Sequence, residues 1–279
     1  MLGRSGGLVN GQNRWFRGVY FSPFMKVFVI IPAAGLGTRM AAVPGAGANR
    51  PTALTKQFAE LQGVPIVVHT LRKFAALDEV TEIYVALRQP EAERFRARLE
   101  QESFNPRVRL VEGGENRQQS VANALAALET HTKPSADDVV LVHDAVRPFV
   151  DAEIIRSVIA AATRHGAAIA GLPAVDTVKQ VDRTAEGAIV VTTIPRERVV
   201  QAQTPQGFRY AILKKAFDEA QADGFTGTDE ASLVERAGQE VAVVMGSARN
   251  IKITSPADLE LAEFYLAQEK KGLTADLRG

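Results

Sequence analysis

The stretch VIIPAAGLGTRM, residues 29–40, decides the fold class and raises the functional question. Its apolar run ends at Pro32, and two alanines lead into a turn that contains Gly35 and Gly37. A glycine-rich turn directly after a strand lets backbone N–H groups approach phosphate oxygens. The pattern predicts a strand–turn unit that binds the phosphates of either a dinucleotide cofactor or a nucleoside triphosphate.

The residues behind this turn favour the triphosphate. A dinucleotide fingerprint needs a third glycine three residues after the second, and an acidic residue about 20 residues further on. Met40 stands where that glycine would be, while Arg39 offers a fork of donors that matches phosphate oxygens. An ordinary tight turn beside a surface arginine is the alternative interpretation.

The regions around the turn alternate between apolar strands and amphipathic helices. Strands are predicted at 26–32, 82–87, 108–112, 139–143 and 167–173, with helices between them at 66–76, 91–102, 118–129 and 151–164. Helices at 210–223, 229–237 and 256–268 and strands at 241–245 and 250–253 are predicted to follow. This order is typical of an α/β fold, a mostly parallel sheet with helices on both faces that binds its ligands at the carboxyl ends of the strands.

Residues 174–207 interrupt the alternation. The segments DTVKQVD (176–182) and AIVVTTI (188–194) flank a turn signal at Glu186–Gly187, which predicts a protruding β-arm. An isolated two-stranded hairpin is marginally stable in water. We therefore expect the arm to lean on another surface, such as a second subunit.

Composition limits the kinds of site that the chain can build. The 279 residues carry a formal net charge of +1, so no overall charge attracts nucleic acid. The absence of cysteine excludes disulfides, thiolate zinc sites and cysteine nucleophiles, and four histidines argue against a multi-histidine metal centre. No apolar run approaches the length that a membrane span needs. We expect a cytoplasmic protein that binds no membrane.

The domain organisation is predicted to be simple. Residues 1–24 are rich in glycine and arginine and lack acidic residues, which indicates a disordered tail or a start site placed upstream of Met25. A transit peptide is the lesser alternative. Residues 25–270 are predicted to form one domain that includes the arm, and residues 271–279 a C-terminal tail.

Further motifs follow predicted strands. Lys56 in TKQF could fold back onto the phosphates, although an exposed lysine is the ordinary case. The loop GGENRQQS (113–120) lets backbone approach a ligand, or merely caps a helix. HDAVRPF (143–149) places Asp144 and Arg147 after the most apolar strand, which suits a metal–phosphate or hydroxyl site or a plain surface ion pair. In the same motif, His143 is expected to be a packed side chain rather than a base.

The order of these motifs is more specific than any one of them. The series AAGLGTRM, KQF, GGENRQQSV, VHDAVRPF, DTVK, QTPQGF, TDEAS and NIKITSPADLELAEFYL resembles the 2-C-methyl-D-erythritol 4-phosphate cytidylyltransferase family over about residues 25–268. The resemblance implies a Rossmann-like fold whose β-arm clasps a second subunit. It also implies a reaction between CTP and methylerythritol phosphate, which yields a CDP-alcohol and pyrophosphate with Mg²⁺ as cofactor.

The resemblance also implies roles for matching residues. Arg39 and Lys56 match the catalytic positions. The nucleotide-binding positions match Pro32, Ala33, Ala34, Gly35, Leu36, Gly37, Thr38 and Lys252, with Gly114 and Ser120 at the cytosine. The side that holds the alcohol phosphate and the ribose matches Asp144, Ala145, Arg147, Thr177, Thr204 and Thr228, and Arg196 matches an arginine offered to the partner's site. Mg²⁺ is expected to be held mainly by the CTP phosphates, with Asp144 at most a weak ligand.

The residues agree with such chemistry, with two departures from the family pattern. A phosphate monoester is mostly a dianion at neutral pH, so catalysis needs positioning and charge neutralisation rather than a protein base. The first departure is the long link 41–55, which puts Thr55 where the family has proline, and the second is Glu115 in place of an aspartate. A ribitol-5-phosphate cytidylyltransferase and an inactive nucleotide-binding relative are the alternatives, and a dinucleotide oxidoreductase is weaker still.

Overall fold

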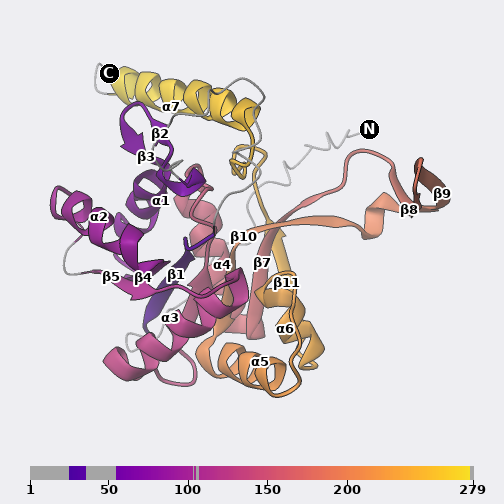
Figure 1. Cartoon of the computed structure of the whole chain (residues 1–279), viewed down its shortest axis with the longest axis horizontal. Helices are drawn as coiled ribbons and strands as arrows, with labels where there is room; N and C mark the ends of the chain where they lie inside the picture. The colour runs from indigo at the N-terminus through magenta and orange to yellow at the C-terminus, as the bar shows by residue number, and fades with distance from the viewer. Residues whose placement is uncertain (1–24, 36–54, 103, 105–106, 277–279) are drawn as a thin grey trace, which may run out of the picture.

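The computed structural model describes residues 25–35, 55–102, 104 and 107–276. Their centre is a seven-stranded sheet with the order β11-β7-β10-β6-β1-β4-β5 (Figure 1). Its strands are β1 (Val27–Pro32), β4 (Val80–Leu87), β5 (Val108–Glu112), β6 (Val139–Val142), β7 (Ala167–Pro173), β10 (Val200–Arg209) and β11 (Ala242–Met245). Every neighbouring pair in this sheet is parallel except the two pairs that β10 makes. The mostly parallel α/β fold predicted from the sequence is confirmed.

Helices cover both faces of the sheet. One face packs against α1 (Ile66–Ala75), α2 (Gln89–Glu100) and α4 (Ala152–His165). The other packs against α3 (Arg117–Thr132), α5 (Tyr210–Ala222) and α6 (Glu230–Arg236). Strand β1 shows why both faces are covered, because Val29 and Ile31 lie in the first core and Phe28 and Ile30 in the second. A strand buried on both faces is a continuous apolar run, as the sequence predicted.

Strand β10 corrects the predicted extent of the arm. The sequence assigned residues 200–207 to the protruding excursion, yet they lie in the central sheet, where Gln206 pairs with both Val142 and Ile169. The arm proper is the hairpin of β8 (Val178–Thr184) and β9 (Gly187–Ile194). The motif QTPQGF is polar and contains a proline, so its sequence pattern is typical of an edge strand or a loop. In the structure it nevertheless lies in an interior strand of the sheet, between β6 and β7.

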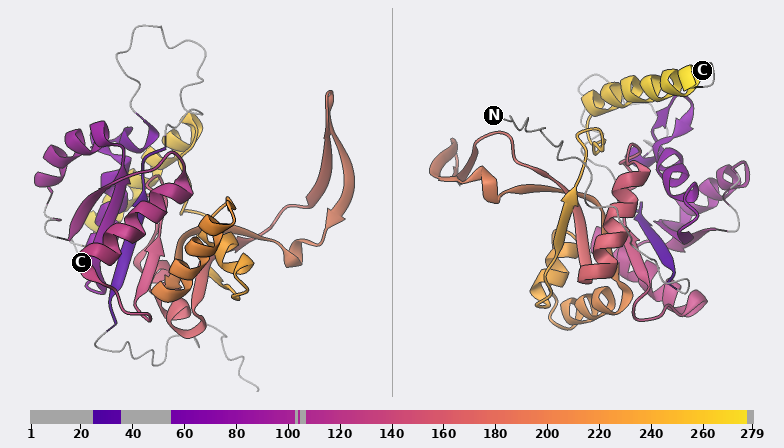
Figure 2. Two further views of the ribbon diagram at one scale, coloured as in Figure 1. Left: turned by 60° about the horizontal axis from the view of Figure 1, so that its bottom comes forward. Right: turned by 180° about the vertical axis from the view of Figure 1, so that it is seen from behind.

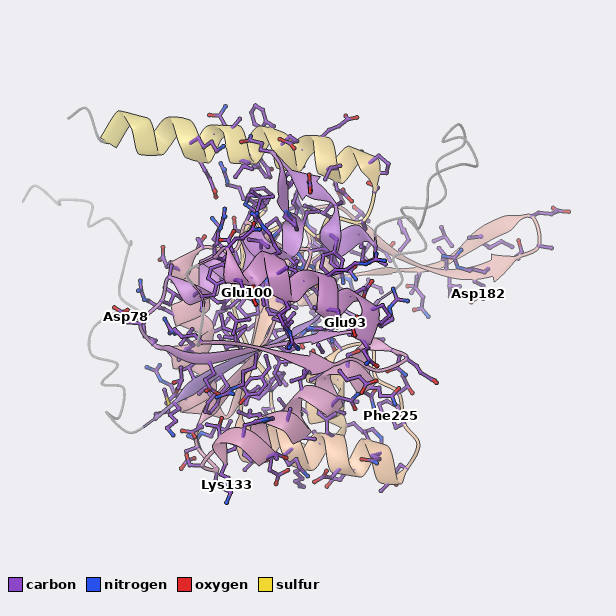
Figure 3. The ribbon with its side chains drawn as sticks, turned by 60° about the vertical axis from the view of Figure 1, so that its left-hand side comes forward. Asp78, Glu93, Glu100, Lys133, Asp182 and Phe225 are labelled. Carbon is purple, nitrogen blue, oxygen red and sulfur yellow. The ribbon has the colours of Figure 1, made fainter. Side chains whose placement is uncertain are left out.

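The hairpin extends far from the rest of the molecule. Figure 2 shows it reaching away from the sheet and helices, and Figure 3 shows Asp182 on it well apart from the side chains of the main body. Three consecutive aliphatic side chains on β9 are exposed, namely Ile189, Val190 and Val191. Exposed apolar side chains that are grouped on one element are typical of interaction surfaces.

The C-terminal region differs from the prediction in two places. Residues 250–253 form no strand, and the segment is instead held by a hydrogen bond from the Ile253 N–H to the Val146 carbonyl oxygen, at 2.9 Å. Helix α7 (Pro256–Asp276) extends beyond the predicted end at residue 268. It crosses above a short hairpin that the sequence analysis missed, formed by β2 (Glu60–Leu61) and β3 (Val64–Pro65) (Figure 1).

Candidate active site

The predicted phosphate-binding unit begins where β1 ends. The backbone N–H of Ala33 donates to the carbonyl oxygen of Ala86 at 2.8 Å, which extends the pairing of β1 with β4 beyond Pro32. The loop after β5 lies directly against this segment, because a Cβ added at Gly113 would come within 2.3 Å of the Ala34 Cβ. The two glycine-rich motifs therefore meet at the carboxyl ends of the parallel strands, which we call the sheet edge. Leu36, Gly37, Thr38 and Arg39 lie outside the described residues.

Lys56 begins a short 3₁₀ helix, η1 (Lys56–Phe58), that is attached to this same edge. The neighbouring Gln57 is buried, and its side-chain Nε2 donates to the carbonyl oxygens of Ala33 at 2.6 Å and Gly35 at 3.2 Å. The sequence left open whether the long link brings Lys56 back to the glycine-rich turn. The contacts of Gln57 place the lysine's neighbour in direct contact with Gly35.

Thr55, which stands where the family has proline, has its own anchor. Its hydroxyl donates to Glu91 Oε1 at 2.9 Å, and Glu91 forms an ion pair of 2.8 Å with Arg88 at the start of α2. On the other side, the ring of Phe58 packs edge-on against Phe95 of α2, with 5.5 Å between centroids. The side chains of Thr55, Gln57 and Phe58 therefore fix the chain where the long link ends, although the proline is absent.

The two residues predicted to read cytosine lie together. The backbone N–H of Gly114 donates to Ser120 Oγ at 3.0 Å, at the first turn of α3. Asn116 caps that helix by accepting from the Gln119 N–H at 2.8 Å. A Cβ at Gly114 would come within 2.4 Å of the Gln119 side chain, so this position requires glycine for close packing. The loop is thus a compact capped turn whose backbone is close to the Ala34 segment.

Asp144 is the centre of a cluster of charges at the carboxyl end of β6. Its side chain is almost buried, and its Oδ2 lies 3.0 Å from Lys252 Nζ and 3.3 Å from Arg147 Nε. Its Oδ1 lies 3.4 Å from Arg117 Nε, and Arg117 Nη1 pairs with Glu230 Oε1 at 2.5 Å. We call these five residues the charge cluster. They come from the loop after β6, from α3, from α6 and from the segment before α7, so the cluster joins four parts of the fold.

The two carboxylates of the charge cluster are shifted in opposite directions. Burial by itself would raise the pKa of Asp144, but the charges of Arg117, Lys252 and Arg147 outweigh it and hold the pKa well below its usual range. For Glu230, burial dominates and raises the pKa, and the charge of Arg117 offsets this only in part. Asp144 is therefore an anion that organises three cations. A cluster of this kind is prepared to receive an anionic ligand.

Thr204 and Thr228 border the charge cluster. Thr204 Oγ1 accepts from the Asp144 N–H at 3.1 Å, and its carbonyl oxygen accepts from Asn250 Nδ2 at 2.8 Å. Thr228 stands two positions before Glu230, at the exposed start of α6. Ala145 is buried beside Asp144, where its carbonyl oxygen accepts from Thr70 Oγ1 at 2.9 Å. These predicted residues therefore lie in one region of the sheet edge.

Thr177 and Arg196 lie apart, at the base of the arm. Arg196 Nη1 donates to the carbonyl oxygen of Val175 at 2.8 Å, and both predicted side chains are exposed. Among the described residues, no hydrogen bond or ion pair joins either of them to the charge cluster. Within one chain, the predicted site is thus divided between the sheet edge and the arm.

His143 is a packed side chain, as predicted. It is fully buried, its ring lies edge-on to Phe74 with 4.8 Å between centroids, and its Nε2 donates to the Arg147 carbonyl oxygen at 3.0 Å. Its Nδ1 is buried and has no partner among the described residues. Burial lowers the pKa of His143 to about 4, so the ring is neutral at physiological pH and has no free access to a substrate proton.

This buried ring predicts a loss of stability in acid. The unfolded His143 has an ordinary pKa of 6.5 and the folded one about 4. Between these values the unfolded chain binds more protons, so stability falls as the pH drops. From pH 7.5 to 5 the group should cost about 2 kcal/mol of unfolding free energy. Urea denaturation at both pH values should show a smaller loss in His143→Phe, and an identical loss in the two proteins would contradict the assignment.

Three residues of the site were missed by the sequence analysis. Arg117, Glu230 and Gln57 lie inside motifs that were quoted, but none was given a role. For Arg117 and Gln57 the available signal was position, since each lies near a loop that follows a strand at the binding edge, whereas Glu230 follows helix α5 and carried no such signal. Among the described residues no group of three or more His, Cys, Asp or Glu side chains could hold a metal ion. Nor is any helix there both long and apolar enough to cross a membrane.

Comparison with known proteins identifies the family. The family model described as 2-C-methyl-D-erythritol 4-phosphate cytidylyltransferase matches residues 27–268. The chain belongs to this family. A member from Acidobacterium capsulatum is 60% identical over 88% of this chain and 98% of its own length, and one from Solibacter usitatus is 53% identical over 88% and 97%.

Solved structures of the family agree with the fold. The crystal structure of the enzyme from Francisella tularensis aligns with a TM-score of 0.68 and 35% identity, over 86% of this chain and 99% of that one. A 4-diphosphocytidyl-2C-methyl-D-erythritol synthase from Anaerococcus prevotii gives a TM-score of 0.71 at 29% identity, over 87% and 99%. The family resemblance stated from the motifs is therefore confirmed.

Proposed function

We propose that this chain joins CTP and 2-C-methyl-D-erythritol 4-phosphate, giving 4-diphosphocytidyl-2-C-methyl-D-erythritol and pyrophosphate. The proposal is supported by family membership together with one structural observation. The glycine-rich turn, the start of η1 and the charge cluster all lie at the carboxyl edge of the same parallel strands. That edge is where an α/β sheet binds its ligands.

The chemistry needs cations more than it needs a base. An oxygen of the alcohol phosphate attacks the α-phosphorus of CTP, a new P–O bond forms, and the bond to the β-phosphate breaks to release pyrophosphate. The attacking group is a dianion, so no proton has to be removed. Lys56 and Arg39 are proposed to stabilise the charge that develops on the transferred group and on pyrophosphate. Lys252 was matched to a nucleotide-binding position from the sequence, but it shares Asp144 Oδ2 with Arg147, and these two cations are proposed to hold the alcohol phosphate.

Mg²⁺ is proposed to enter with the nucleotide. Both oxygens of Asp144 face cations, Arg117 at Oδ1 and Arg147 with Lys252 at Oδ2. A divalent cation is disfavoured at such a carboxylate, so the donor set fits an ion held by the triphosphate oxygens rather than by the protein. There the ion would neutralise phosphate charge. A role for Asp144 as a direct ligand is correspondingly disfavoured.

The arm is proposed to form a homodimer and to complete the site of a partner. The supporting observations are the exposed aliphatic row on β9 and the separation of Arg196 and Thr177 from the charge cluster. A homodimer should give a molar mass near twice the chain mass of 30.1 kDa in light scattering. A mass near that of one chain at micromolar concentration would contradict the proposal. The cytoplasmic location expected from the sequence stays a prediction.

The activity can be tested with two alcohols. Purified protein with CTP and Mg²⁺ is expected to release pyrophosphate when methylerythritol phosphate is added, and much less when ribitol 5-phosphate replaces it. The reverse preference would identify the ribitol-5-phosphate enzyme. Binding of CTP without turnover of either alcohol would indicate an inactive nucleotide-binding relative.

A further inference from the structure

Gln57 occupies an unusual position for an amide side chain. It is 2% exposed, and its Nε2 donates to two backbone carbonyl oxygens of the segment after β1, those of Ala33 and Gly35. Because both partners are acceptors, the NH₂ side of the amide must face them. The residue therefore holds this segment through two hydrogen bonds that no carboxylate or aliphatic side chain could replace.

These bonds fix the orientation of a peptide group at the proposed phosphate site. A trans peptide is planar, so its C=O and N–H point in opposite directions. Holding the Ala33 carbonyl toward Gln57 therefore turns the Ala34 N–H away from it. Ala34 is buried, yet its N–H donates to no acceptor among the described residues. A backbone N–H in this position, next to a glycine-rich turn and turned away from Gln57, can donate to a ligand oxygen.

We propose that Gln57 is a positioning residue, which draws the carbonyl groups of Ala33 and Gly35 away from the nucleotide and leaves the Ala34 N–H to face its phosphates. This inference rests on the proposed function, since it needs a nucleoside triphosphate at the turn. A carbonyl oxygen directed at a phosphate would repel it, so the orientation of these groups decides whether the turn attracts or rejects the ligand.

The same side chain couples the turn to Lys56. Lys56 immediately precedes Gln57 in η1, and the Thr55 and Phe58 side chains attach the helix to α2. With the amide in place, the short helix that sets the backbone of the turn also carries Lys56, the residue next to the amide in sequence. Loss of the amide should therefore weaken nucleotide binding first, while the alcohol-phosphate side, which depends on the charge cluster, should be little affected.

Gln57→Glu provides the sharpest test, because it keeps the size and replaces the donor by an acceptor. Calorimetric titration with CTP and Mg²⁺ at pH 8 should show binding about 10-fold to 100-fold weaker than in the wild type, since two carbonyl groups lose their donor and meet a carboxylate. A protonated carboxyl group can donate one hydrogen bond. The deficit relative to the wild type should therefore shrink several-fold at pH 6.

Two further variants separate positioning from general damage. Gln57→Met removes the donors without adding charge and should weaken CTP binding about tenfold, with a deficit that does not change between pH 6 and 8. Gln239→Glu is the matched control, because Gln239 Nε2 also donates to two carbonyl oxygens, those of His165 and Glu240, on an exposed part of the fold. It should bind CTP as the wild type does.

The outcomes distinguish this inference from the proposed function. Failure of the wild-type chain to bind CTP would contradict the function itself. Wild-type binding of CTP together with unchanged affinity in folded Gln57→Glu or Gln57→Met would overturn only the role of Gln57. The role of Gln57 would also be overturned if these variants raised the KM for the alcohol phosphate as much as the KM for CTP. If Gln57→Glu does not fold, as thermal melting would show, the Gln57→Met result decides.

Discussion

Arg117→Ala is expected to lower the free energy of unfolding by about 3–5 kcal/mol, because it leaves a buried charge without its partner. Glu230 is 1% exposed and pairs with Arg117 Nη1, and its other oxygen is buried with no partner among the described residues. Asp144 is less affected, since it keeps Arg147 and Lys252. Chemical denaturation at pH 7.5 measures the loss.

Two further variants show whether the lost stability comes from the ion pair between Arg117 and Glu230. Glu230→Gln keeps the shape without the charge, so the Arg117→Ala/Glu230→Gln double variant should lose less than the sum of the two single variants. An unpaired buried carboxyl group takes up a proton more readily than the unfolded one, so the deficit of Arg117→Ala should also shrink toward pH 5. A loss below about 1 kcal/mol would place the pair among ordinary surface ion pairs.

Lys56→Ala is expected to have the largest effect on catalysis. Removal of one preorganised cation at the transferred phosphate costs about 3 kcal/mol, or roughly a hundredfold in kcat. The fold should be kept, because the side chains of Thr55, Gln57 and Phe58 also attach η1 to the rest of the protein. Pyrophosphate release and thermal melting are the two measurements. A fall in kcat below threefold with CTP binding intact would contradict a catalytic role.

The same variant can test whether the arm serves a partner's site. When Lys56→Ala and Arg196→Ala chains exchange, the mixed dimer contains one site with both residues only if Arg196 acts across the interface. Random exchange should then restore about a quarter of wild-type activity, since half of the dimers are mixed and each has one complete site. Confirmed exchange without recovery would show that Arg196 serves its own chain or neither.

The sequence predicted the parallel sheet because its central strands are buried on both faces. Strand β1 is a continuous apolar run followed by a glycine-rich turn, and its neighbour β6 is likewise apolar and buried throughout. Strand β10 carries no such signal. Its Gln203 and Gln206 are buried but use their amides on Ser247, Asp229 and the Ala231 N–H. Polar side chains satisfied by tertiary hydrogen bonds make a central strand look like a loop.

Three members of the charge cluster were named as candidate site residues in the sequence analysis. Asp144 and Arg147 were matched to the alcohol-phosphate side and Lys252 to the nucleotide, and in the structure both cations form ion pairs with Asp144. The pairing of Arg117 with Glu230 could not be predicted, since it depends on the first turns of α3 and α6 lying close together on the same face of the sheet. Chain order shows which residues follow strands but does not show which of them face one another.

The junction of the arm with the sheet has a consequence for how the protein can change. Val200 pairs with Pro173 in the sheet, and the Ala174 N–H donates to the Val199 carbonyl oxygen at 3.0 Å. The arm therefore begins at the end of β7 and ends at the start of β10, at two positions that pair with each other in the sheet. A tight turn could replace the arm there without altering any other strand. The arm is a module that evolution or an engineer can lengthen, shorten or exchange while the catalytic sheet stays as it is.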